Sequence, residues 1–252
     1  MWPFNKKGIE ITRPVVKSII CIPGYWKDST EIFGKTEGKF MVVGDILMDI
    51  KKKAHYSFEL CTRDENMRRS FEVAGKGTGV TSEFLDEIKR HTSVIYITGE
   101  TGNFTSAKTL AHVAAILVSN GGIGVKVETT GKAFEKNKWL SFVDIGDDAH
   151  LYELFVIDSL MDKDGTTFSC GMHNIGYRDV IVSGLKFQEA QRLVRMFNYH
   201  RVIDKPIIKT GETFSLDIES PIYFITNEAL QPYDGDQLFY NPFGMWRLVR
   251  AE

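Results

Sequence analysis

The sequence has few cysteines, no excess of charge and no long apolar run, and each shortage excludes a class of protein. Cysteine occurs only as Cys21, Cys61 and Cys170, and a small, odd, widely spaced set is typical of reduced thiols rather than of a disulfide framework. Lys and Arg number 31 against 33 Asp and Glu, so no basic footprint for nucleic acid stands out. The longest apolar stretch, 110–118, is far shorter than the ~20 residues that cross a bilayer. We expect a cytoplasmic protein that binds neither nucleic acid nor a membrane.

The length and the N-terminal composition remove further possibilities. Met1–Lys7 contains lysines but no apolar segment after them, so we expect no signal peptide. A chain of 252 residues typically buries about 70–75% of its unfolded surface, so it needs no disulfide or metal for stability. We expect neither a metal nor a cofactor.

Hydrophobic patterning predicts strands mixed with helices. The β-branched segment 15–22, which stops at Pro23-Gly24, predicts a buried strand. Further strands are predicted by a pair over 40–50 and 55–60 with a lysine-rich turn, and by segments 93–98, 123–128, 151–157, 166–170, 178–182 and 222–225. Amphipathic spacing predicts helices from about 64–74 (capped by Asp64), after Thr81, over 105–119 and from 187. The strand–helix–strand order over 93–128 favours a parallel pair with a right-handed crossover.

This order of elements predicts an α+β fold with one or more mixed, mostly antiparallel sheets. We expect the helices to pack on one face, and the chain to form either two related halves or one integrated domain. The two halves would span 15–134 and 150–250. Their seam would lie near 135–150, where a short helix is followed by a loop.

Several segments together resemble an uncharacterised bacterial family that is catalogued as a domain of unknown function. They are Thr98–Asn103, Gly122–Phe134, Cys170–Asn174, Gly211–Ser215 and Asn241–Leu248. The resemblance extends from about Val16 to Arg250 and is most specific in the second half. It implies a bacterial protein, but it brings no catalytic mechanism and no ligand.

The stretch Ser169–Asn174 is the first candidate site, because it places Cys170 three residues before His173. One hypothesis makes Cys170 a nucleophile for hydrolysis or acyl transfer and His173 its base, with Asn174, Asp179 or Asp158 orienting the imidazole. A metal site would need more ligands than the Cys-x-x-His spacing supplies. The favoured interpretation is structural: a buried thiol at a strand end and a hydrogen-bonded histidine in a turn.

The segment 99–109 is the second candidate site, since it connects a strand to a helix, as phosphate-binding loops do. Its candidate ligand-binding residues are Gly99, Gly102, Thr105 and Lys108. Ala107 stands where the P-loop pattern requires its second glycine. An N-capped helix with Lys108 in solvent is therefore the favoured interpretation.

No complete catalytic signature is present. The leading functional hypothesis is therefore a non-catalytic binding or interaction module, with another protein as a possible partner. The aromatic segment 239–246 either ties the C-terminus onto the core or forms a partner surface. The alternatives are an enzyme that uses Cys170 and His173, and a phosphate or nucleotide site at 99–109.

Overall fold

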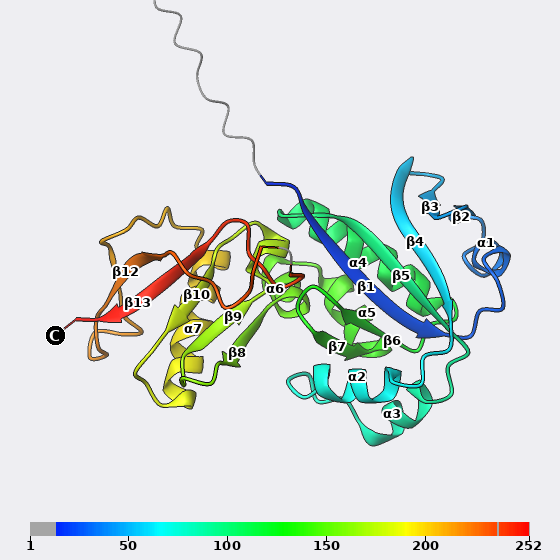
Figure 1. Cartoon of the computed structure of the whole chain (residues 1–252). Helices are drawn as coiled ribbons and strands as arrows, with labels where there is room; N and C mark the ends of the chain where they lie inside the picture. The colour runs from blue at the N-terminus through cyan, green and yellow to red at the C-terminus, as the bar shows by residue number, and fades with distance from the viewer. Residues whose placement is uncertain (1–13, 236, 252) are drawn as a thin grey trace, which may run out of the picture.

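The computed structural model describes residues 14–235 and 237–251, which build two sheets and the helices around them (Figure 1). The expectation about a signal peptide concerns residues outside this part of the chain. The first sheet has the order β2-β3-β4-β5-β1-β6-β7, with every neighbouring pair antiparallel. Its strands are β1 (Val16–Gly24), β2 (Phe40–Val43), β3 (Ile46–Asp49), β4 (Ala54–Thr62), β5 (Ser93–Thr101), β6 (Gly124–Val127) and β7 (Lys132–Glu135).

Helices cover both faces of this sheet, because alternate residues of its central strands are apolar on both sides. Ile20 and Ile22 of β1 belong to the main core with α4 (Phe104–Ser119). Cys21, between them, packs with α2 (Met67–Ala74) and α3 (Ser82–Ile88) on the opposite face. A short helix, α1 (Thr30–Lys35), lies before the edge strand β2.

The second sheet has the order β11-β12-β13-β10-β9-β8, and β10 and β13 form its parallel pair. Its strands are β8 (Ile157–Met161), β9 (Thr167–Cys170), β10 (Asp179–Val182), β11 (Thr213–Phe214), β12 (Tyr223–Glu228) and β13 (Met245–Arg250). The helix α7 (Phe187–Ile203) packs on it through residues spaced three and four apart, namely Ala190, Leu193, Val194 and Phe197.

The segment between the sheets is helical. It contains α5 (Lys136–Ile145), α6 (Asp148–Phe155) and, after β9, the 3₁₀ helix η1 (Met172–Ile175). Figure 1 shows α6 between the two sheets. One buried cluster joins Ile20 and Leu110 of the first sheet region to Phe155, Met172 and Val202. The predicted seam is therefore filled by shared core.

The predicted α+β class with mostly antiparallel sheets is confirmed. The expectation that helices pack on one face is wrong for the first sheet, since α4 lies on one face and α2 and α3 on the other. The predicted strand–helix–strand unit over 93–128 has the predicted direction but not the predicted pairing: β5 and β6 are both antiparallel to β1, so they run parallel to each other, and β1 lies between them. β5 and β6 are therefore not hydrogen-bonded to each other, because the nine-residue β1, paired along its whole length with β5, separates them. The expected strand pair over 40–60 is a three-strand meander, because 40–50 folds back on itself as β2 and β3.

Side-chain burial and helix caps decide the outcome of three local predictions, at 151–157, Thr81 and Asp64. The segment 151–157, predicted as a strand, is mostly α6, because Asp147 caps the helix at the His150 amide (2.8 Å) and Leu151, Leu154 and Phe155 are buried together. The Thr81 cap is confirmed by its bond from the Phe84 amide, whereas the N-cap of α2 is Asn66 rather than Asp64. In the described part of the chain, no helix is both long and apolar enough to cross a membrane.

Candidate functional site

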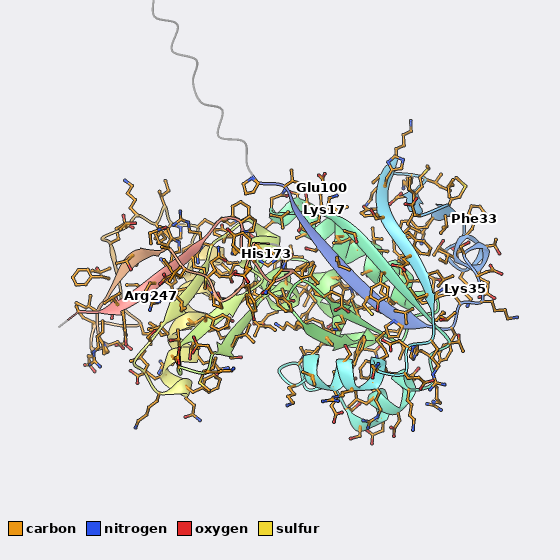
Figure 2. The ribbon with its side chains drawn as sticks, in the orientation of Figure 1. Lys17, Phe33, Lys35, Glu100, His173 and Arg247 are labelled. Carbon is orange, nitrogen blue, oxygen red and sulfur yellow. The ribbon has the colours of Figure 1, made fainter. Side chains whose placement is uncertain are left out.

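The structure brings the two sequence-predicted sites together at the junction of the sheets. The Gly102 amide, at the end of β5, donates to the Asn174 carbonyl of η1 at 2.9 Å. The Asn174 side chain accepts from the Ser18 hydroxyl of β1 and donates to the Gly171 carbonyl at 3.1 Å. Figure 2 places His173 in this middle region. Thus Cys170–Asn174 and Gly99–Thr109 meet, but as tightly packed backbone.

The Cys170 thiol is not placed as a nucleophile. Burial, and secondly the charge of Asp179, raise the pKa of Cys170 well above its usual value, whereas an activated thiol needs a lowered pKa. Its polar contact is the Phe239 carbonyl at 3.9 Å, and no hydrogen bond in the described residues joins it to His173. The catalytic role of Cys170 and His173 stays a prediction that this geometry does not support.

Asp179 is the acid that lies closest to the His173 imidazole, with 3.9 Å from Nδ1 to Oδ2. The Asp179 carboxylate already accepts from the Ser169 hydroxyl (2.8 Å) and the Asn241 amide (2.6 Å). Among the described residues, His173 Nδ1 has no hydrogen-bond partner. This network ties the segment after β12 to β9 and β10, which is a structural task.

The residues of the predicted phosphate loop are also used for packing. Gly99 belongs to β5 rather than to a loop, and a Cβ there would lie 2.9 Å from Leu110 of α4. Asn103 caps α4 at the Ser106 amide (2.9 Å), and Thr105 is exposed. Lys108 donates to the Gly146 carbonyl at the end of α5 (2.7 Å) and so does not reach toward the start of its own helix. Phosphate binding stays a prediction without geometric support.

A different site lies among α5, α6 and α7. The left-handed Gly146 ends α5, and Asp147 starts α6 at once, so the two helices turn sharply against each other. The outward side of α7 forms the third wall. Together they surround a hollow of about 440 Å³ lined by Phe142, Ala149, His150, Glu153, Arg195, Met196 and Tyr199.

The lining of this helical hollow is mostly apolar, with one ion pair at its edge. Met196 is 45% exposed and Tyr199 37%, although both belong to a helix whose other side is core. Arg195 pairs with Glu153, and His150 Nδ1 lies 2.7 Å from its partner Asp147. An apolar concavity with a few polar groups is the usual form of a ligand site.

Behind the ion pair lies a buried group of charges that the sequence does not reveal. The Lys132 ammonium donates to the Val156 carbonyl at 2.8 Å and lies 3.7 Å from Glu153 Oε2. Asp158 accepts from the Tyr152 hydroxyl (2.5 Å) and the Asn198 amide (2.9 Å). Burial lowers the pKa of Lys132 and raises that of Asp158. Shifted pKa values beside a concavity are a marker of functional sites.

A second hollow, of about 460 Å³, lies between α2 and the strands of the first sheet. Its lining includes Glu59, Tyr96 and Glu128, together with Lys126, which forms a 2.8 Å ion pair with Glu128. It is more polar than the helical hollow. The helical hollow is therefore the better candidate. Within the described residues, no three His, Cys, Asp or Glu side chains gather as metal ligands do.

Comparison of the chain with protein-family models, with curated proteins and with solved structures finds no match. The resemblance to the bacterial family stays a prediction.

Proposed function

We propose that this chain is a non-catalytic binding module whose recognition site is the helical hollow. The observation that carries the proposal is an uncovered, mostly apolar concavity of about 440 Å³ between three helices. Its volume falls within the ~300–1,000 Å³ of small-molecule sites. Exposed apolar side chains that gather around a concavity are a common mark of binding surfaces.

The wall residues support binding rather than catalysis. Phe142, Met196 and Tyr199 offer apolar surface, and the polar lining groups Arg195, Glu153 and His150 all have ionic or hydrogen-bonding partners. A nucleophile would need an activated group at the concavity. The described lining residues include no Cys, Ser or Lys, and Glu153, which could also act as a nucleophile, is paired with Arg195.

A cytoplasmic setting is part of the same proposal. It is supported by Cys21, Cys61 and Cys170, which are all free thiols in the structure. A protein partner is a further prediction, and the ligand considered first is a small molecule because the hollow has the matching volume.

The experiment is a fluorescence titration with 1-aminoanthracene, a neutral apolar dye. We expect one dye per chain, and we expect Ala149→Trp, which fills the hollow from α6, to weaken binding at least about tenfold. The control is Val73→Trp, which adds the same ring at an exposed position of α2 and should leave dye binding unchanged. No dye binding by the natural chain, or equal binding by Ala149→Trp, contradicts the proposal.

A further inference from the structure

Two cations beside the helical hollow, Arg195 and Lys132, have the same carboxylate partner and differ in exposure. Glu153 is one carboxylate serving two cations: one oxygen pairs with Arg195, and the other lies 3.7 Å from the Lys132 ammonium. Arg195 is half-exposed at the edge of the hollow, whereas Lys132 is buried behind it. The cation that a ligand can reach is therefore Arg195.

The second carboxylate of the group does not satisfy Arg195. Asp158 Oδ2 lies 3.9 Å from Arg195 Nη1, beyond hydrogen-bond distance, and it accepts from Tyr152 instead. Arg195 makes its one hydrogen bond to a described residue from Nη2, to Glu153. A guanidinium carries five N–H donors, so most of the donors of Arg195 are available for a ligand.

The other titratable groups at the hollow are also accounted for. The His150 imidazole lies one turn before Glu153 on α6, and it is hydrogen-bonded to Asp147, the N-cap of the same helix. Glu153 keeps a partner if Arg195 turns to a ligand, because Lys132 stays 3.7 Å away. An arriving anion can thus replace Glu153 on Arg195 without leaving this partly buried carboxylate unpaired.

We infer that the helical hollow takes an amphipathic anion, with its apolar part against Phe142, Met196 and Tyr199 and its carboxylate on Arg195. This inference rests on the proposed function and adds the chemical class of the ligand. Arginine and carboxylate pair in a planar, two-bond geometry that fixes orientation as well as charge. An amine would instead meet the unsatisfied guanidinium donors.

The test uses three probes that share a ten-carbon alkyl group: decanoate, decan-1-ol and decylamine, each below its critical micelle concentration at pH 7. Each competes with 1-aminoanthracene on the full chain. We expect decanoate to bind about tenfold more tightly than decan-1-ol, as one charge-assisted hydrogen-bonded pair provides, and decylamine to bind most weakly.

Two variants separate this inference from the proposed function. Arg195→Gln should remove the advantage of decanoate and leave decan-1-ol unchanged. The control, Arg192→Gln, changes an exposed arginine on α7 that lines a different pocket and should retain the advantage. Three results would overturn the inference of an anionic ligand. They are equal affinity of all three probes, tighter binding of decylamine, and an advantage of decanoate that persists in Arg195→Gln. If no probe displaces the dye, the proposal that the helical hollow is a binding site is overturned.

Discussion

The junction of the sheets and the helical hollow use polar residues in opposite ways. At the junction, Cys170, His173 and Asn174 are buried, and Asn174 is hydrogen-bonded to the Ser18 side chain of β1 and to the Gly102 amide that follows β5. At the hollow, Arg195, Met196 and Tyr199 stay exposed, and the space between helices is open. The region richest in suggestive residue types is structural, whereas the site with room for a ligand has no motif. Residue types thus identify chemistry only where the fold leaves space for it.

The largest expected effect lies at the junction, at Gly171. Its φ is +108°, and a Cβ would lie 2.0 Å from the Phe155 carbonyl oxygen. We expect Gly171→Ala to lower the free energy of unfolding by about 4 kcal/mol, as backbone strain and overpacking combine. Urea denaturation measures it.

The matched control is Gly184→Ala, because Gly184 also has a positive φ (+78°) but nothing lies within 4 Å of its Cβ position. It should cost only about 1 kcal/mol. Equal losses for the two variants would show that the junction is not tightly packed.

The second largest effect is expected at Asn174, whose side chain joins β1 to η1. Asn174→Ala leaves the Ser18 hydroxyl and the Gly171 carbonyl without this partner in a buried site. We expect a loss of about 3 kcal/mol. Asn137→Ala, at an exposed position of α5, should change stability by less than about 0.5 kcal/mol. A loss at Asn174 as small as that at Asn137 argues against a structural junction.

A smaller effect is expected for Cys170→Ser. It replaces a buried thiol by a hydroxyl near one carbonyl and should cost about 1 kcal/mol. In the natural chain, a thiol reagent should modify Cys61 quickly, since it is only partly buried, and Cys170 and Cys21 slowly. Rapid, selective modification of Cys170 would revive the nucleophile hypothesis.

The smallest effect concerns the pH dependence contributed by Asp158. Burial raises its pKa in the folded chain, so between the unfolded and folded pKa values the folded state binds more protons. The contribution of Asp158 to stability is therefore fully present below the unfolded pKa and is lost as pH rises through the folded pKa. Asp158→Asn should flatten this part of the stability curve, measured by denaturation at a series of pH values. If stability depends on pH with the same slope in Asp158→Asn as in the natural chain, Asp158 does not cause this part of the pH dependence.

Much of the fold could be predicted from local signals. The strand at 93–98 and the helix at 105–119 lie within β5 and α4, and the strand at 178–182 matches β10 to within one residue, because their periodicity and caps act over a few residues. The order of the strands could not be predicted, since β1 pairs with β5, a strand that is far from it in the sequence. β13 is also missed, because the aromatic segment 239–246, which overlaps its start, predicts a tie onto the core or a partner surface rather than a strand.

The candidate site could not be predicted, because its residues come from distant segments. Lys132 follows a glycine in a turn, where a lysine normally points to solvent, yet it lies under α6. Arg195 and Met196 lie between buried positions of α7, as any solvent-facing residues do. Only the angle between α5 and α6, set at Gly146 and Asp147, turns these surface residues into the wall of a hollow.

The measurement that tests the binding claim most directly is a titration of the ¹⁵N-labelled chain with decan-1-ol, followed by amide chemical shifts. Binding in the helical hollow predicts that shifts gather at Ala149, His150, Met196 and Tyr199, while Gly171 and Asn174 stay unchanged. Shifts centred on the junction, or on Tyr96 in the hollow of the first sheet, would contradict this account.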